Sequence, residues 1–234
     1  MSSHGRVDGR DARRGVGAVQ AQRTSRDGCM TPQPSGAPAH ETAVVVVHEI
    51  YGVNAHIERV ADALRAYRCD VFTPSFLPAG AVFSTDDEAR AYRDFLREPG
   101  LERMAEALVG FVGDLRPDYR RVLCVGFSVG ATCAWLASAS ADLDGAVCFY
   151  GSRIRDHAQL QPAAPCLLLF AEREPGFSVP EVAAVLRHRR GVTVETYACG
   201  HGFCNPGSLS YDPVHARRAW ESAVRFLRLP ERSG

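Results

Sequence analysis

A serine between two glycines is the residue of this chain whose type and surroundings best suit chemistry. Ser128 stands in Gly126-Phe127-Ser128-Val129-Gly130, directly after the apolar run 121–125 and before a run of small residues. A strand, a tight turn and a helix would expose its hydroxyl, because flanking glycines let the turn close where a Cβ would clash. A serine hydroxyl is a weak nucleophile and needs a neighbouring base and an acid that orients the base. The motif alone is only moderately specific, so the interpretation depends on finding those two groups downstream.

One histidine lies where a general base is expected. His201 stands in Cys199-Gly200-His201-Gly202-Phe203, just after the last predicted strand, and its glycine neighbours would let the loop bend the imidazole over the sheet. An imidazole with a pKa of about 6.5 can take the serine proton at neutral pH. Four other histidines are more simply explained as exposed or packing residues: His4, His40, His188 and His215.

Two carboxylates compete for the role of the acid. The apolar run 165–170 ends in Ala171-Glu172-Arg173-Glu174-Pro175, so Glu172 and Glu174 both follow a predicted strand, and one of them is expected to be a solvated loop charge. The resulting chain order is serine, acid, histidine, with each residue just past the carboxyl end of a strand. That combination is a much stronger signal than the serine motif alone.

The negative oxygen of a tetrahedral intermediate also needs fixed N–H donors. The residue after the nucleophile and one residue after the first buried strand supply such donors in proteins of this design. We therefore expect an oxyanion hole formed by the backbone N–H groups of Val129 and Ile50.

Alternating strands and helices are predicted to hold these residues. The valine run 43–47 is typical of a strand buried on both faces of a parallel sheet. The pattern predicts an α/β protein with a doubly wound, mostly parallel sheet, helices on both faces and ligands bound at the carboxyl ends of the strands. Strands are expected near 43–48, 69–73, 121–126, 145–150, 166–171 and 192–197, and helices near 54–67, 86–97, 101–116, 129–140, 178–189 and 213–228.

Composition narrows the class of protein. The 234 residues are 46% hydrophobic and 23% charged with a net charge of zero, which argues against a nucleic-acid or membrane partner. All of the basic residues are arginine, so a catalytic lysine is excluded. The eight cysteines include no CxxC pair, and Cys124, Cys148 and Cys166 fall in predicted buried strands, as expected for reduced thiols in a cytoplasmic protein. No apolar run is long enough to span a membrane, and no signal peptide is recognisable.

The first 40 residues differ from the rest of the chain. They are rich in Arg, Gly, Ser, Pro and Gln and have no helical or strand periodicity, so we expect a disordered N-terminal arm over 1–40 and a single domain of catalytic size over 41–230. A mis-assigned start of the chain is an equally open alternative, with Met30 as one candidate.

Several segments together resemble the dienelactone hydrolase family, over about residues 43–228. His48-Glu49-Ile50-Tyr51-Gly52-Val53-Asn54 is similar to the family's E-x-[FY]-G-V-N segment, and further matches are the 126–130 motif, Phe149-Tyr150-Gly151 and Gly200-His201-Gly202-Phe203. The resemblance implies the α/β-hydrolase fold, a small ester or lactone substrate cleaved through an acyl-enzyme, and no cofactor. Counted from the proline that opens its strand, the family's acid corresponds to Glu174. The resemblance also implies a substrate pocket that includes Glu49, Arg90, Tyr92, Tyr150, Phe203 and Asn205.

Three departures from the family pattern stand out. Ser128 replaces the usual cysteine nucleophile, Glu174 replaces an aspartate, and Asn205 replaces an arginine that binds a substrate carboxylate. The family's two short N-terminal strands have no convincing counterpart in residues 1–42. Arg90 and Tyr92 are explained almost as well by an exposed helix face.

Other functions remain open at this point. The same triad would serve an acyltransferase or a carbon–carbon hydrolase, and a non-catalytic binding protein can keep the scaffold. A metal site at Cys199, His201 and Cys204 is improbable, because three ligands on one short loop lack a fourth at zinc-type spacing. We expect a monomer or homodimer.

Overall fold

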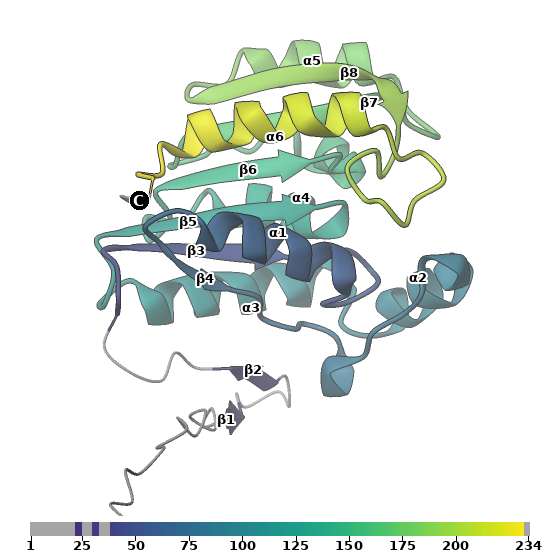
Figure 1. The fold of residues 1–234 in the computed structure, drawn as a ribbon. Helices are drawn as coiled ribbons and strands as arrows, with labels where there is room; N and C mark the ends of the chain where they lie inside the picture. The colour runs from purple at the N-terminus through teal and green to yellow at the C-terminus, as the bar shows by residue number, and fades with distance from the viewer. Residues whose placement is uncertain (1–21, 25–29, 33–37, 232–234) are drawn as a thin grey trace, which may run out of the picture.

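The computed structural model of the protein describes residues 22–24, 30–32 and 38–231, and its centre is a six-stranded parallel sheet (Figure 1). The strand order is β4-β3-β5-β6-β7-β8, and every neighbouring pair is parallel. The expected α/β-hydrolase type of sheet is therefore confirmed. The strands are β3 (Thr42–Val47), β4 (Asp70–Phe72), β5 (Arg121–Phe127), β6 (Gly145–Phe149), β7 (Cys166–Arg173) and β8 (Val192–Gly200).

Helices cover both faces of the sheet. In Figure 1, α1 (Ala55–Arg65) and α6 (Pro213–Leu227) lie in front of it, and α3 (Gly100–Leu115), α4 (Val129–Ala137) and α5 (Val179–Arg187) lie behind. Successive β3 residues belong alternately to the two cores, as Val45 packs into the cluster with α3 and α4 and Val46 into the cluster with α1 and α6. This double burial explains why β3 is a continuous apolar run.

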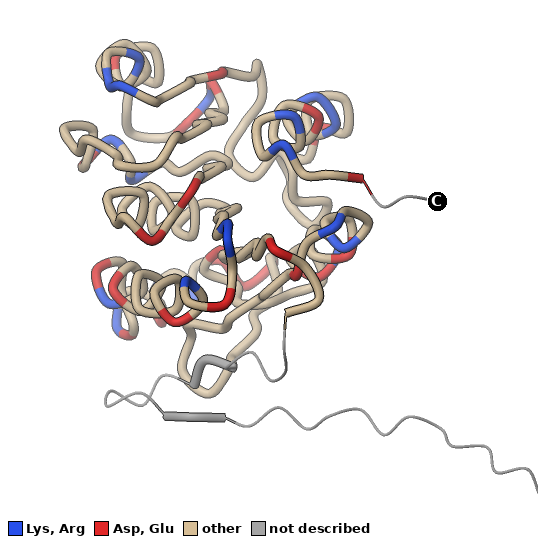
Figure 2. The backbone as a smooth tube through the Cα atoms, turned by 90° about the vertical axis from the view of Figure 1, so that its left-hand side faces the viewer, with Lys and Arg blue, Asp and Glu red and all other residues tan. Residues whose placement is uncertain are grey.

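The remaining elements gather beyond the carboxyl ends of the strands. Helix α2 (Glu88–Arg97) projects there in Figure 1, preceded by the short 3-10 helices η1 (Pro78–Gly80) and η2 (Thr85–Asp87). A third 3-10 helix, η3 (Ser152–His157), follows β6. Acidic and basic positions are interspersed along the outer helices and loops (Figure 2).

All predicted strands and helices of the domain are present. The ends of β7, β8 and α4 differ from the predicted ends. Strand β7 continues to Arg173 and β8 to Gly200, both further than the apolar pattern indicated, with a register irregularity between Ala171 and Arg173. Helix α4 ends at Ala137 rather than near 140, because the next backbone bonds are of the tighter i→i−3 type, from the Ala139 N–H to the Leu136 carbonyl and from the Ser140 N–H to the Ala137 carbonyl.

The N-terminal segment holds two strands that we did not expect. β1 (Gln22–Thr24) and β2 (Met30–Pro32) form an antiparallel pair of their own, separate from the main sheet. The sequence offered no convincing counterpart of the family's two N-terminal strands in residues 1–42, and these two short strands lie within that segment. The disordered arm predicted for 1–40 otherwise falls largely outside the described residues.

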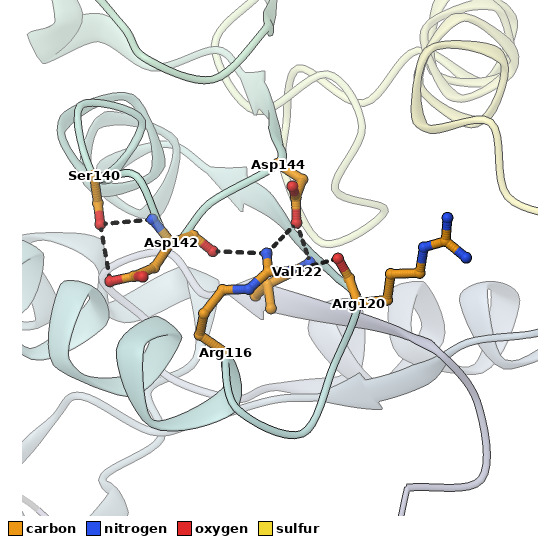
Figure 3. A network of polar contacts seen from close by, with 6 residues as sticks. All are labelled: Arg116, Arg120, Val122, Ser140, Asp142 and Asp144. Atoms are coloured by element: carbon orange, nitrogen blue, oxygen red, sulfur yellow. Dashed lines mark hydrogen bonds and ion pairs between the residues drawn. The ribbon is translucent and has the colours of Figure 1, made fainter.

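A polar network fixes the amino end of β5 (Figure 3). The Asp144 carboxylate accepts hydrogen bonds from Arg116 Nη1 at 2.5 Å and from the Val122 N–H at 2.8 Å. Arg116 also donates to the carbonyl groups of Arg120 and Asp142. These contacts join the end of α3 to the starts of β5 and β6, and so anchor the strand whose other end carries Ser128.

Candidate active site

Ser128 occupies a strained turn between β5 and α4. Its backbone has φ 53° and ψ −115°, in the half of φ/ψ space that residues other than glycine rarely adopt. The turn is held by the Ser128 N–H, which donates to the Phe149 carbonyl at 3.0 Å. The flanking glycines are required by close approach, because a Cβ on Gly126 would lie 2.3 Å from the Gly130 carbonyl oxygen, and one on Gly130 would lie 2.4 Å from the Val47 oxygen.

Ser128, His201 and Glu174 form one chain of hydrogen bonds. Ser128 Oγ lies 3.0 Å from His201 Nε2, and His201 Nδ1 lies 2.8 and 2.9 Å from the two carboxylate oxygens of Glu174. His201 directly follows β8, and Glu174 directly follows β7. With the proton on Nδ1, the imidazole offers the Nε2 lone pair to the serine hydroxyl. This geometry has the form of a nucleophile, a base and an orienting acid.

The structure distinguishes the two candidate acids. The Glu174 side chain is fully buried against His201, whereas Glu172 is exposed near the end of β7. The longer β7 explains the difference, because residues 172 and 173 continue the strand and Glu174 is the first residue free to turn toward the sheet edge. The placement therefore agrees with the choice of Glu174.

Electrostatics favour a basic His201. Burial alone would lower the pKa of this histidine, but the hydrogen bond and negative charge of Glu174 outweigh it, with help from Glu49 and Glu88, and raise the pKa above its ordinary value. The side chain remains 33% exposed, so a substrate can reach it. The protonated form of His201 is thus stabilised.

The two backbone N–H groups expected to form an oxyanion hole, those of Val129 and Ile50, have no acceptor among the described residues. Val129 is the first residue of α4, where an N–H has no acceptor within the helix. The N–H of Ile50 likewise donates to no backbone or side-chain group among the described residues. Gly52, at φ 76°, lets the chain carrying Ile50 pass the loop after η1, because a Cβ there would lie 2.2 Å from the Ala81 oxygen.

His48 holds the loop that carries Ile50, a role that the sequence analysis missed. It is fully buried, its Nδ1–H donates to the Glu49 carbonyl at 2.6 Å, and its Nε2 accepts the Phe76 N–H at 2.9 Å. Burial lowers the pKa of His48 to about 4, although the bond to Glu49 opposes the shift. A neutral imidazole with one donor and one acceptor therefore joins the two chain segments. The only sequence signal for this role is the position of His48 in segment 48–54, which resembles the family pattern.

Glu49 and Asn205 bind each other beside the site. Asn205 is 2% exposed, and its Nδ2 donates to Glu49 Oε2 at 2.8 Å while its Oδ1 accepts the Gly207 N–H at 2.9 Å. Burial raises the pKa of Glu49, although His201, Asn205 and Tyr150 oppose the shift. Both ends of the Asn205 amide are therefore occupied within the protein.

Of the other expected pocket residues, two are buried near His201 and two are exposed. Tyr150 and Phe203 are buried, with the Tyr150 ring 5.2 Å from the ring of His201 and 5.6 Å from that of Phe203. Tyr150 therefore packs against His201, and Phe203 packs against Tyr150. Arg90 is exposed over the Phe83 ring, and Tyr92 is 46% exposed, with no contact to Ser128, His201 or Glu174 among the described interactions.

A second residue that the sequence analysis missed is Glu88, at the start of α2. Its charge contributes to the raised pKa values of Glu49, Tyr51 and His201. No sequence pattern marks it, because α2 approaches the sheet edge only in the folded chain.

The cysteines near His201 are neutral thiols. Burial raises the pKa of Cys199 to about 12 and that of Cys204 well above its usual value, so neither offers a thiolate. Within the described ranges, no cluster of three His, Cys, Asp or Glu side chains is arranged to hold a metal ion. None of the described helices is both long and apolar enough to cross a membrane.

Comparisons with known proteins agree with this architecture. The sequence model of the dienelactone hydrolase family matches residues 29–229, beginning ahead of the domain boundary expected at 41. The uncharacterized protein YczH of Bacillus subtilis (strain 168) is 37% identical over 172 residues, which are 72% of this chain and 84% of YczH. A protein of Aquifex aeolicus (strain VF5) named "Putative carboxymethylenebutenolidase" is 27% identical, over 80% of this chain and 87% of that protein.

A solved structure shows the same fold. The crystal structure named "Putative Dienelactone Hydrolase" from Klebsiella pneumoniae subsp. pneumoniae MGH 78578 aligns with a TM-score of 0.71 at 20% identity, covering 90% of this chain and 98% of that one. With the match of the family model, the resemblance noted in the sequence is confirmed. The chain belongs to the dienelactone hydrolase family and is an ester- or lactone-cleaving hydrolase.

Proposed function

We propose that this protein hydrolyses small neutral esters or lactones through an acyl-enzyme formed on Ser128. The observation that carries the proposal is the continuous hydrogen-bonded chain from Ser128 Oγ through His201 to Glu174. The strained φ of 53° at Ser128 supports it, because such strain persists where the surrounding structure holds a side chain in a required position.

In the first half-reaction, Ser128 Oγ attacks the substrate carbonyl while His201 Nε2 takes its proton. Glu174 stabilises the imidazolium, and the N–H groups of Ile50 and Val129 bind the negative oxygen of the tetrahedral intermediate. The intermediate collapses as His201 returns the proton to the leaving alkoxide. Water, activated by the same imidazole, then attacks the acyl-enzyme and releases the carboxylic acid and the free serine.

A serine nucleophile fits the surroundings of Ser128. Its only described side-chain hydrogen bond is to the imidazole of His201, whereas Glu49 is bound to Asn205. A carboxylate cannot deprotonate a serine hydroxyl unaided, so a base in direct contact is needed. His201 meets that need, and Glu49 is left without a role in proton transfer.

A neutral substrate fits the charges around the site. Glu49, Glu88 and Glu174 all act on His201 electrostatically, and the Asn205 amide is fully engaged. A substrate carboxylate entering this site would be repelled by like charges, with no described cation among the residues that contact the Ser128–His201–Glu174 chain. Neutral esters and lactones escape that repulsion.

Labelling with a fluorophosphonate probe tests the nucleophile. We expect stoichiometric labelling of the wild-type protein, none of Ser128→Ala, and full labelling of Ser140→Ala, a serine variant in the network at the far end of β5. Intact-mass measurement during turnover of a slow ester should show one acyl group, mapped to Ser128. Equal labelling or equal esterase activity in Ser128→Ala would overturn the proposal. Adding alcohol acceptors to the same assay measures transfer, and predominance of the transfer product would make the protein an acyltransferase.

A further inference from the structure

A small apolar pocket opens between α1 and α6, apart from the Ser128–His201–Glu174 chain. Its volume is about 270 Å³, near the small end of ligand sites. The rings of Phe127, Phe149 and Trp220 form much of its wall, and neither Ser128 nor His201 lines it. This volume admits a ligand built on one aromatic ring.

Two nitrogen-bearing side chains of α1 line this pocket without partners. His56 is 4% exposed and its Nε2 is a buried atom with no hydrogen-bond partner, although the ring packs edge-on against Phe127 at 4.8 Å. Arg59 is exposed, and no ion pair or hydrogen bond joins it to another described residue. Leaving a buried ring nitrogen unsatisfied costs free energy, so an acceptor bound at this nitrogen would be stabilised.

The charges of the pocket lining have one sign. Arg59 is the only charged residue among the ten that line the pocket, and no acidic residue is among them. Burial and the neighbouring Arg59 lower the pKa of His56 to about 4, so its imidazole is neutral at physiological pH and offers one N–H. A guanidinium and an imidazole N–H beside an apolar cavity are suited to a carboxylate whose remaining atoms are apolar.

We propose that this pocket is a second binding site, separate from the active site, for a small aromatic carboxylate. The ring of the ligand would lie among Phe127, Phe149 and Trp220, and its carboxylate would accept hydrogen bonds from His56 and Arg59. The proposal does not rest on the identity of the nucleophile.

The Tyr150 ring lies between His201 and the pocket wall. One side of its ring meets His201 at 5.2 Å, and Phe127 of the pocket wall lies 6.0 Å away from it. The pocket also includes Cys204, on the loop that follows His201. An occupant would therefore contact the neighbours of the active site without reaching the serine.

Binding of benzoate, with benzamide as its neutral counterpart, tests the site. Isothermal titration or ligand-detected NMR should show saturable one-to-one binding of benzoate to the full-length protein and at least tenfold weaker binding of benzamide. Arg59→Gln and His56→Phe should each weaken benzoate binding about tenfold, the loss of one charge-assisted hydrogen bond. His56→Phe keeps the ring against Phe127, and Arg59 is exposed, so both variants should fold.

Blocking the pocket separates it from the active site. Ala63 is exposed at the rim, and Ala63→Trp should abolish benzoate binding, whereas Val185→Trp on α5, at the opposite face, should leave it unchanged. Unaltered binding in Ala63→Trp would place benzoate in the catalytic site and overturn the proposal. Absence of saturable binding to the wild-type protein, or equal affinity for benzamide, would also overturn it.

Discussion

The acid that orients His201 gives the sharpest test of the proposed mechanism. In Glu174→Gln the side chain keeps its size, but the fully buried carboxylate loses its charge and can present an amide N–H to His201 Nδ1. The imidazole then favours the tautomer with its proton on Nε2, which cannot accept the proton of Ser128. Loss of an equivalent acid in a related arrangement lowers kcat about 10⁴-fold, and we expect a fall of about 10²–10⁴-fold here.

The pH dependence supplies the second signature of this change. The pKa of His201 is raised by Glu174 against the opposing effect of burial, so wild-type kcat/KM should rise with pH through a pKa above the ordinary histidine value, as the imidazole loses its proton. Without the Glu174 charge the opposing effect of burial remains, and the rising limb should move to lower pH. Thus kcat/KM of Glu174→Gln should be lower than that of the wild type at every pH, and it should reach its plateau at a lower pH.

The assay measures hydrolysis of phenyl acetate in a pH-stat, which records the acid released. The pH profile then does not depend on the absorbance of an ionising product. Glu172→Gln is the matched control, because it makes the same change on an exposed side chain of β7 and should alter kcat less than twofold. A Glu172→Gln defect larger than that of Glu174→Gln would refute the assignment of the acid. An unshifted pH profile in Glu174→Gln would refute the electrostatic argument even if kcat falls.

Further predictions concern proton transfer, the neighbouring carboxylate, substrate charge and stability. His201→Ala should lower kcat by several orders of magnitude with an unchanged circular dichroism spectrum, and near-wild-type turnover would exclude it as the base. Glu49→Gln should retain or raise kcat and shift the rising pH limb downward, since the Glu49 charge helps to raise the pKa of His201; a loss as large as that of His201→Ala would contradict this. In matched esters differing by one carboxylate, the neutral member should have the higher kcat/KM, most clearly at low salt, because Asn205 provides no positive charge; a salt-sensitive preference for the anion would refute it. Asp144→Ala should lower the free energy of unfolding in urea by about 1–2 kcal/mol, since it removes a backbone hydrogen bond and a partly exposed ion pair, and should leave kcat unchanged; a comparable loss of kcat would contradict the purely structural role.

The sequence predicted the order of elements well, because the central strands of the main sheet carry a strong local signal. The run Thr42–Val47 is buried at every position, and that pattern has few alternatives. The ends of β7 and β8 were less predictable, because residues such as Glu172 and Arg173 are exposed and polar yet continue the ladder through backbone hydrogen bonds. Backbone pairing at a strand end depends on the neighbouring strand and leaves no trace in hydrophobicity.

The candidate site divides in the same way. Ser128 and His201 stand in local motifs with glycines on both sides, and the structure brings them within 3.0 Å of each other. His48 and Glu88 were missed because their effects act between segments distant in the chain, through the bond from Phe76 and through the charge acting on Glu49. Arg90 was proposed as a pocket residue from the family pattern. In the structure it is exposed and lies over the Phe83 ring, so its role in the pocket stays a prediction.

The close approach at Gly130 has a consequence for how this enzyme can change. The carbonyl oxygens of Val47 and His48 would lie only 2.4 and 2.5 Å from a Cβ of residue 130, so the backbone at the start of α4 packs directly against the backbone at the end of β3. Val129 and Ile50 extend from the two sides of that junction, and the spacing of their N–H groups is therefore set by main-chain geometry that side-chain substitutions hardly alter. Substitutions that change the substrate are then expected in α2 and in the loop before α6, because these segments border the site and do not form the junction. A mutational library confined to those segments should yield altered specificity with the rate of the chemical step retained, whereas substitutions at the junction should remove activity altogether.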